Sequence, residues 1–380
     1  MQRSNVKLRR MMIDQLIAFD GPPGTGKTRR IVEEASKLDA QGKRIAIVTY
    51  TKDAAAVVRS RLPDVESGTV YSLTWDYVKP FVVGKSTVVR AARNYSKRRI
   101  HHVADPALEQ YRLDAPSMRP PHRLDEVAKR LHAWSIGPPP IDLDAEQAEA
   151  QLKFVLPLSK WLRAGAPIPR SRKYDVVFID ESQDMSWVEL RAAAALIHGG
   201  GELRAFGDPG QAIFAGSKGV LGSSLPPVWQ AAQDFHVLDK GYRVGNPVAS
   251  VAASVLRSWY DRPASMFEAD HRTELLTWDG KQPPRTGLVL GYSRNAVFKG
   301  FVTWGLNRTG VVPKVAAADR ELVLSTGHAA KGAEANEVYL LPWSRIAMNR
   351  FEQRDPATLR LLYVMLTRAK KRVYLSLIHI

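Results

Sequence analysis

The 380-residue chain contains no cysteine, so disulfides and thiolate metal sites are excluded. No apolar run approaches the roughly 20 residues that a membrane-spanning helix needs. The first residues are basic and precede apolar ones, but the apolar part runs directly into a glycine-rich loop, which argues against a signal peptide. We therefore expect a cytoplasmic protein that does not bind a membrane.

Acidic residues are also scarce. Asp and Glu number 38 against 55 Lys and Arg, which gives a formal net charge of +17. This excess favours a polyanionic partner such as nucleic acid, although charge alone is only a correlation. A chain of this length would overfill one core, and we expect two or three domains.

The strongest motif is the octapeptide GPPGTGKT at residues 21–28. It fits G-x-x-x-x-G-K-[ST], in which backbone N–H groups hold phosphates, Lys27 reaches the terminal phosphates and the Thr28 hydroxyl binds Mg²⁺. Residues 16–19 predict a buried strand before it, and residues 29–38 predict a helix after it. A Gly/Pro surface turn is the alternative. The expected nucleotide-binding residues here are Gly21, Pro22, Pro23, Gly24, Thr25, Gly26, Lys27, Thr28 and Arg29.

A second strand is predicted at residues 44–50 and a helix at 53–62, an alternation typical of a doubly wound α/β sheet. Tyr50 and Thr51 would lie at the carboxyl end of this strand, where ligands bind. Tyr50 is a candidate platform for base stacking, with core packing as the alternative. Residues 68–78 are rich in aromatics, including Tyr71, and predict a further strand.

From about residue 79 to 172 the chain is basic, proline-rich and irregular, which predicts an inserted subdomain with helical pieces. Arg90, Arg93 and Lys97 would share one face of a helix there. Binding to a phosphate backbone is the functional interpretation, and a solvated charged face is the alternative. The nearby nucleotide motif favours the functional one.

A second set of polar residues follows two further predicted strands. Asp180 and Glu181 come directly after the apolar run at residues 176–179, at the edge of the sheet where the phosphate loop would lie. Asp180 is expected to hold Mg²⁺ and Glu181 to activate the attacking water. Gln211 follows a strand at 202–206 within GDPGQAIF, where it could orient water and sense the terminal phosphate. An ordinary turn is the alternative for Gln211.

These motifs, in this order, resemble those of superfamily 1 helicases of the UvrD/Rep type. The similar segments are GPPGTGKT, VTYTKDAA, GTVYSL, IDESQD, GDPGQAIF, GYRVGNP, LSTGHAAKGAE at 324–334 and LLYVMLTRAKK at 361–371. The resemblance covers the chain except the basic insertion.

The resemblance implies an α/β protein of two RecA-like lobes with doubly wound parallel sheets, and a basic, mainly helical insertion in the first lobe. We expect the first lobe at residues 1–78 and 173–235, the insertion at 79–172 and the second lobe at 236–380. The sequence independently predicts a second sheet, because strand-like runs recur at 287–292, 311–315, 321–325, 337–341 and 373–378. A helix is predicted at 358–368.

The resemblance also assigns roles outside the first lobe's motifs. Arg243 and Arg368 would be arginine fingers that stabilise the transferred phosphoryl group. Tyr242 would stack on adenine, Glu334 would contact the ribose, and His328 and Lys331 would lie near the nucleic-acid and phosphate paths. Phe214 joins Tyr50, Thr51 and Tyr71 among the candidates for nucleic-acid contact.

Some family features are missing. No adenine-reading glutamine precedes the phosphate loop, and Ala215 and Gly216 stand where an aromatic usually follows Gln211. The large insertion before residue 324 is absent, and the chain ends nine residues after Lys371, which together favour a truncated or a compact, phage-like motor.

We therefore expect an ATP-dependent DNA helicase or translocase that uses ATP and Mg²⁺. It would move 3′ to 5′ on single-stranded DNA and at single-strand/duplex junctions, as a monomer, in DNA repair or replication. An RNA helicase and an ATP-gated nucleic-acid clamp that does not unwind are the alternatives.

Overall fold

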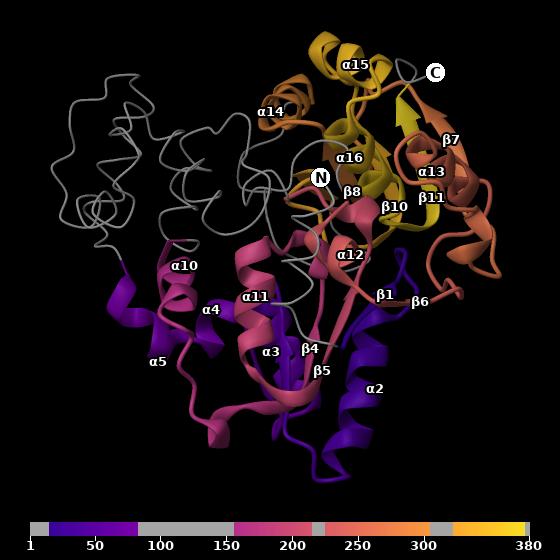
Figure 1. The fold of residues 1–380 in the computed structure, drawn as a ribbon. Coiled ribbons are helices and arrows are strands. Elements are labelled where there is room, and N and C mark those ends of the chain that lie inside the picture. Colours follow the sequence, from indigo (N-terminus) through magenta and orange to yellow (C-terminus); the bar gives the residue numbers. More distant parts are fainter. Residues whose placement is uncertain (1–14, 83–155, 215–224, 305–321, 377–380) are drawn as a thin grey trace, which may run out of the picture. The chain divides into compact units, whose positions relative to one another are not determined.

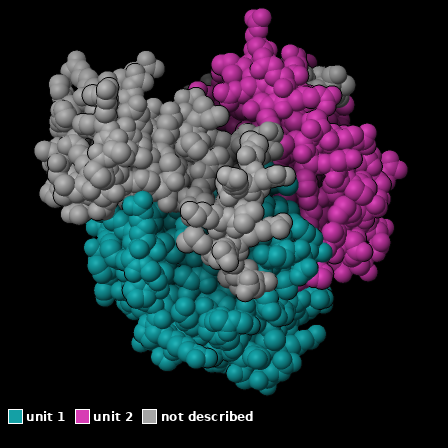
Figure 2. Space-filling view, in the orientation of Figure 1, with its two compact units in different colours: residues 1–18, 28–206, 214–235 teal, residues 19–27, 207–213, 236–380 magenta. Residues whose placement is uncertain are grey.

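The computed structural model describes residues 15–82, 156–214, 225–304 and 322–376 (Figure 1). The chain divides into two compact units (Figure 2). Residues 1–18, 28–206 and 214–235 form the first unit, and residues 19–27, 207–213 and 236–380 form the second. The second unit therefore includes two short segments that precede its main part at residues 236–380, and the expected domain boundaries stay predictions. Within the described residues, no helix is both long and apolar enough to cross a bilayer.

The first sheet has six strands in the order β3-β2-β4-β5-β1-β6. Its strands are β1 Leu16–Asp20, β2 Ile45–Val48, β3 Glu66–Gly68, β4 Tyr174–Ile179, β5 Ile197–Gly207 and β6 Asp234–Val237. β2 pairs in parallel with β3 and β4, and β4 with β5. Every residue of β2 is buried, as expected for a parallel strand covered on both faces. This explains the uninterrupted apolar runs in the sequence.

The helices around this sheet begin where the apolar periodicity changes from strand to helix. They are α2 Lys27–Asp39, α3 Lys52–Arg61, α4 Val70–Leu73, α5 Trp75–Val78, α10 Leu156–Arg163, α11 Trp187–Ala195 and α12 Pro227–Ala231. α11 starts with a capping box, in which the Ser186 hydroxyl and the Glu189 carboxylate satisfy each other's backbone N–H groups. Most of the predicted insertion, with Arg90, Arg93 and Lys97, lies outside the described residues.

The predicted strand at residues 68–78 is wrong. Only Gly68 belongs to a strand, and α4 and α5 follow it. The Thr69 hydroxyl accepts a hydrogen bond from the Ser72 N–H and begins α4. The buried positions Val70, Thr74 and Val78 recur every four residues, which is the helical period. The β-branched and aromatic composition favours a strand. The four-residue spacing of the buried positions and the Thr69 cap favour helices instead, and helices form.

The second sheet has five strands in the order β7-β11-β10-β8-β9, and every neighbouring pair is parallel. The strands are β7 Glu274–Trp278, β8 Gly287–Gly291, β9 Leu322–Thr326, β10 Ala335–Leu340 and β11 Ala369–Ser376. The helices are α13 Val248–Leu256, α14 Arg294–Thr303, α15 Arg345–Glu352 and α16 Pro356–Leu366. Four of the predicted strands and the predicted helix are confirmed to within four residues at each end, and the run at 311–315 lies outside the described residues. The two parallel α/β sheets confirm the predicted fold class.

Candidate nucleotide-binding site

The phosphate loop joins β1 to α2, as the sequence predicts. Gly24 and Gly26 have φ angles of 79° and 80°, in the left-handed region that glycine adopts without a steric cost. The Gly21 N–H donates to the Gly207 carbonyl at 2.8 Å, which fixes the beginning of the loop. α2 begins at Lys27, so its N-terminal N–H groups and its dipole are available to an anion bound in the loop.

Lys27 folds back over the phosphate loop. Its Nζ donates to the Gly21 carbonyl oxygen at 2.8 Å, and only 9% of the residue is exposed. The Thr25 hydroxyl donates to the Pro22 carbonyl at 2.8 Å and closes the same loop from within. The lysine ammonium is thus held inside the ring of backbone groups that would surround phosphates, as the motif requires.

Thr28 and Asp180 lie together in the first unit. The Thr28 hydroxyl donates to Asp180 Oδ2 at 2.7 Å, although the two residues are 152 positions apart. A hydroxyl and a carboxylate are the hard oxygen ligands that Mg²⁺ prefers, and Mg²⁺ commonly takes its remaining ligands from phosphates and water. The donor set therefore fits a magnesium ion. Among the described residues, no cluster of three or more metal-binding side chains provides a second candidate.

Glu181 occupies a strained backbone conformation directly after β4. Its φ angle is 56°, which is uncommon outside glycine. The Glu181 N–H donates to Asp180 Oδ1 at 3.0 Å, and Gln183 Nε2 donates to Glu181 Oε2 at 2.6 Å. These bonds give the two adjacent carboxylates different hydrogen-bond donors. Such strain is often found at functional sites, which supports the separate roles predicted for the pair.

Gln211 connects two parts of the second unit. It lies in the short helix η5 (Pro209–Gln211) and is almost fully buried. Its Nε2 donates to Asp208 Oδ2 at 2.9 Å, while its Oε1 accepts from Arg368 Nη2 at 3.0 Å. Lys331 Nζ donates to the Gln211 backbone carbonyl at 2.9 Å. Arg368 and Lys331, which come from two other motifs, therefore both contact Gln211.

Arg243 and Tyr242 lie against the phosphate loop within the second unit. The Tyr242 N–H donates to the Gly24 carbonyl at 3.0 Å, and a Cβ on Gly24 would come within 2.5 Å of the Arg243 Cβ. The Tyr242 side chain is 61% exposed, so its ring is accessible for stacking. Arg243, a predicted arginine finger, and Tyr242, which is predicted to stack on adenine, therefore both lie at Gly24.

Glu334 pairs with two cations. Arg243 Nη2 lies 2.8 Å from one of its carboxylate oxygens, and Lys370 Nζ lies 2.6 Å from the other. Burial would raise the pKa of Glu334, but the hydrogen bond from Lys370 and the charge of Arg243 hold the pKa below its ordinary value. Glu334 therefore orients the Arg243 guanidinium, a contact that the sequence did not predict.

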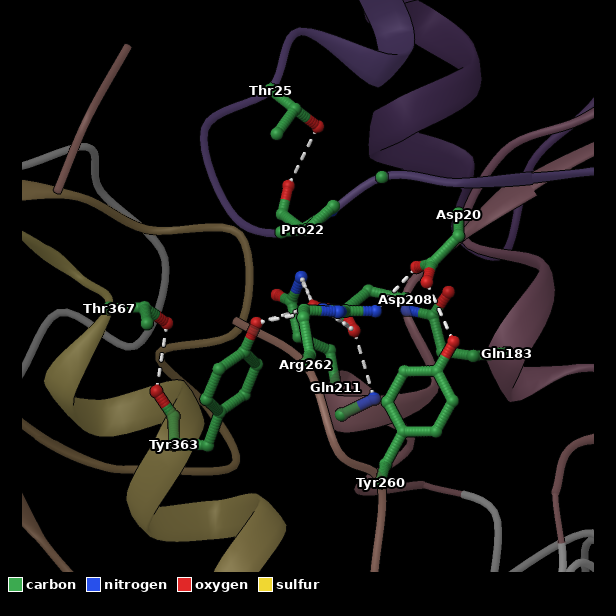
Figure 3. A network of polar contacts seen from close by, with 12 residues as sticks. Asp20, Pro22, Thr25, Gln183, Asp208, Gln211, Tyr260, Arg262, Tyr363 and Thr367 are labelled. Carbon is green, nitrogen blue, oxygen red and sulfur yellow. Dashed lines mark hydrogen bonds and ion pairs between the residues drawn. The ribbon is translucent and has the colours of Figure 1, made fainter. Parts of the chain in front are cut away.

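A buried ionic network lies beside these residues (Figure 3). Arg262 Nη2 lies 2.5 Å from Asp20 Oδ1, and Arg262 Nη1 lies 2.8 Å from Asp208 Oδ1. Tyr260 donates to Asp20 at 2.7 Å, and Tyr363 donates to Asp208 at 3.1 Å. Burial alone would lower the pKa of Arg262, but Asp208, Tyr363 and Asp20 raise that pKa well above its ordinary value. The guanidinium is therefore charged at every physiological pH.

Sequence reasoning missed this network. Asp20 directly precedes the GPPGTGKT motif and Asp208 lies within GDPGQAIF, and these positions were the only available signal. Arg262 lies outside every motif, in the loop between α13 and η7 (Ala264–Met266). No local pattern could have identified it.

The predicted nucleic-acid residues are in several places. The Tyr50 and Phe214 rings stack with centroids 5.8 Å apart and an interplanar angle of 10°. Tyr71 packs against Trp75 at 5.4 Å. The Thr51 hydroxyl accepts from the Ala54 N–H and caps α3. His328 is exposed in the loop after β9. Their roles in binding stay predictions.

Arg29 was expected to help hold the nucleotide. It is exposed on α2 and pairs with Glu33 at 2.7 Å, one turn further along the helix. This contact is a typical i,i+4 pair and by itself indicates no ligand role.

Comparisons with known proteins support the family suggested by the motifs. A family model described as AAA domain matches residues 2–217, and a model for the UvrD-like helicase C-terminal domain matches residues 321–376. The chain therefore belongs to the AAA domain family, and the match at its C-terminal part agrees with the resemblance to UvrD/Rep-type superfamily 1 helicases. A search of curated proteins found no match.

Viral helicases are among the solved structures that match this chain. The crystal structure of arterivirus nonstructural protein 10 (helicase) is 16% identical, with a TM-score of 0.44, over 95% of this chain and 59% of that chain. The PRRSV helicase is 14% identical, with a TM-score of 0.47, over 99% of this chain and 55% of that chain. A complex of arterivirus nonstructural protein 10 with DNA is 14% identical, with a TM-score of 0.44, over 99% of this chain and 63% of that chain. This chain thus spans about three fifths of the length of these helicases.

Proposed function

We propose that the protein is an ATP-dependent helicase that translocates 3′ to 5′ on single-stranded DNA. The observation that carries this proposal is the contact between Arg368 and Gln211 at 3.0 Å, in a chain whose phosphate-loop motif is complete. It places a guanidinium from the last motif on the glutamine of the GDPGQ motif. A nucleotide-binding protein that only stores its ligand has no need for this arrangement, whereas a hydrolase needs charge at the transferred phosphoryl group.

Each residue of the site has a distinct task in this proposal. The phosphate loop binds the phosphates, and Lys27 contacts the terminal one. Thr28 and Asp180 would hold Mg²⁺, which supplies positive charge at the phosphate oxygens when bound. Glu181 accepts the proton of the attacking water. Tyr242 stacks on the base.

The two arginines connect turnover to movement. Arg243 and Arg368 stabilise the charge that develops on the transferred phosphoryl group, an effect worth about 10³ to 10⁵ in rate for a typical arginine finger. Because Arg368 also contacts Gln211, the presence or absence of the terminal phosphate would change the contacts that hold this arginine. Bound ATP thus stabilises one arrangement of the chain, and the chain leaves that arrangement after hydrolysis.

Single-stranded DNA is the proposed track. The strong basic excess favours a phosphate backbone, and the stacked Tyr50 and Phe214 provide aromatic faces, each worth about 1–3 kcal/mol per stacked base. The IDESQD and LTRAK segments favour 3′ to 5′ movement. The cytoplasmic location, the monomeric state and a role in DNA repair or replication stay predictions.

Strand displacement tests this function. Duplexes with a 3′ or a 5′ single-stranded overhang, in DNA and in RNA, are incubated with the native chain and Mg-ATP. We expect unwinding of the 3′-tailed DNA only. Unwinding from 5′ tails alone would reverse the polarity, and a preference for RNA would identify an RNA helicase. ATP-dependent binding with negligible turnover would instead identify a clamp.

A further inference from the structure

Arg262 is a buried charged residue that the proposed mechanism does not use. Only 3% of the residue is exposed, although it lies in a loop. A buried guanidinium is costly unless excellent geometry and further hydrogen bonds compensate for its desolvation. Its two carboxylate partners are themselves buried, with Asp208 fully so and Asp20 6% exposed. Fold stability alone therefore does not explain why Arg262 is buried between these two carboxylates.

The two carboxylates come from two separate segments of the proposed hydrolytic site. Asp20 is the last residue of β1 and directly precedes Gly21 of the phosphate loop. Asp208 directly precedes η5, which ends at Gln211. One planar guanidinium bridges both, through Nη2 to Asp20 and Nη1 to Asp208. A lysine ammonium is a single point of charge on a flexible stem and cannot reproduce this fork.

Asp208 transmits the position of Arg262 to Gln211. Its Oδ1 accepts from Arg262 and from the Gly210 N–H, at 2.8 and 2.9 Å. Its Oδ2 accepts from Gln211 Nε2 and from the Tyr363 hydroxyl, at 2.9 and 3.1 Å (Figure 3). A carboxylate can only accept, so it selects the NH₂ end of the amide and turns Gln211 Oε1 toward Arg368.

We propose that Arg262 is a positioning residue that ties the start of the phosphate loop to the Gln211 amide. Through Asp20 it fixes where the loop leaves β1, and through Asp208 it fixes which end of the amide meets Arg368. This inference rests on the proposed function, because it gives Gln211 a part in hydrolysis. Tyr260 and Tyr363 complete the hydrogen bonding of the two carboxylates.

Hydrogen exchange tests the positioning without requiring turnover. Arg262→Lys is compared with Arg360→Lys, a matched change at another buried arginine of the second unit, which lies 3.7 Å over the Trp259 ring. Exchange is measured for residues 19–27 and 207–213, with β10 as the reference for global opening. We expect about a tenfold increase in both loops for Arg262→Lys alone. An equal increase in both variants, or none in Arg262→Lys, overturns the proposal.

A double-mutant cycle tests the route through Gln211. Single-turnover ATP hydrolysis at saturating ATP is measured for Arg262→Lys, Gln211→Ala and the double variant. Arg262→Lys should lower the rate about tenfold in the native background and less than about twofold in the Gln211→Ala background. Equal effects in both backgrounds contradict the proposed route. An inactive native chain would contradict the proposed function instead, and the exchange experiment would still decide the role of Arg262.

Discussion

Arg368 Nη2 donates a hydrogen bond to Gln211 Oε1 at 3.0 Å across 157 positions of sequence. Arg368 directly follows the C-cap residue of α16, and its Nε donates to the Val364 carbonyl of that helix at 2.9 Å. The helix therefore aims the guanidinium at the GDPGQ segment. Two residues with predicted catalytic roles are thus held in contact by the fold itself.

The first prediction concerns this finger. Arg368→Lys keeps the charge but loses the fork that reaches Gln211, and we expect the turnover rate to fall about 10³-fold. Affinity for ATP, measured with a fluorescent nucleotide, should change little. Arg372→Lys is the matched control, because Arg372 is on β11 and forms exposed ion pairs with Glu274 and Glu337. Similar rates for the two variants would remove Arg368 from the mechanism.

The second prediction concerns the backbone of the phosphate loop. Gly24→Ala places a methyl group 2.5 Å from the Arg243 Cβ at a φ angle of 79°, so the loop or Arg243 must shift. Gly42→Ala has a similar φ angle of 75° but open space around the new methyl group. Both variants should lose about 1–2 kcal/mol of stability from the left-handed backbone. Only Gly24→Ala should also weaken ATP binding, by about tenfold or more, in an equilibrium titration.

If Gly42→Ala weakened ATP binding equally, the contact between the loop and Arg243 would have no part in the effect. Chemical denaturation of both variants gives the stability change on which this comparison depends.

The third prediction concerns the magnesium site. Thr28→Ala removes the hydroxyl that lies 2.7 Å from Asp180, whereas Thr28→Ser retains a hydroxyl. We expect Thr28→Ala to need about tenfold more Mg²⁺ for half-maximal ATP hydrolysis, and Thr28→Ser to behave nearly as the native chain. A magnesium titration of the ATPase rate measures this. Identical magnesium curves for the native chain and Thr28→Ala would exclude the hydroxyl as a ligand.

Local motifs could predict the strand and helix around the phosphate loop because each motif is a short stretch with a fixed geometry; the roles of the site residues stay predictions. The spacing from Gly21 to Thr28 already required a strand before the loop and a helix after it, and β1 and α2 confirm both. Asp180 could be placed near Thr28 because parallel strands bring their carboxyl ends to one edge. The contact at 2.7 Å agrees.

Long-range partners could not be predicted in the same way. Arg262 binds Asp20 across 242 positions and Asp208 across 54, and nothing in the surrounding sequence marks it. Glu334 was assigned to the ribose by family resemblance, but its pairing with Arg243 depends on how distant segments pack. The prediction of a strand at residues 68–78 was wrong because it relied on composition and not on the four-residue spacing of the apolar and threonine positions.

The fourth prediction concerns pH. His198 Nε2 lies 2.6 Å from Asp175 Oδ1, and this hydrogen bond raises the pKa of His198 and lowers the pKa of Asp175. The raised pKa of His198 means that its stabilising contribution is complete below about pH 6.5 and is lost as the pH rises through the folded-state value. The contribution of Asp175 is lost only in acid, as the pH falls through its lowered pKa.

The difference in melting temperature between the native chain and His198→Gln should therefore be largest near pH 6 and shrink toward about pH 8. Thermal melts at several pH values measure it. A constant difference over this interval would show that protonated His198 does not stabilise the fold.

The most direct measurement of the proposed mechanism is the rate of ATP hydrolysis with and without single-stranded DNA, for the native chain and for Glu181→Gln. We predict strong stimulation of the native chain by DNA, steeply weakened by salt, and loss of turnover in Glu181→Gln with ATP binding retained. A native rate that DNA does not change, or a Glu181→Gln variant as fast as the native chain, would contradict a nucleic-acid motor driven from this site.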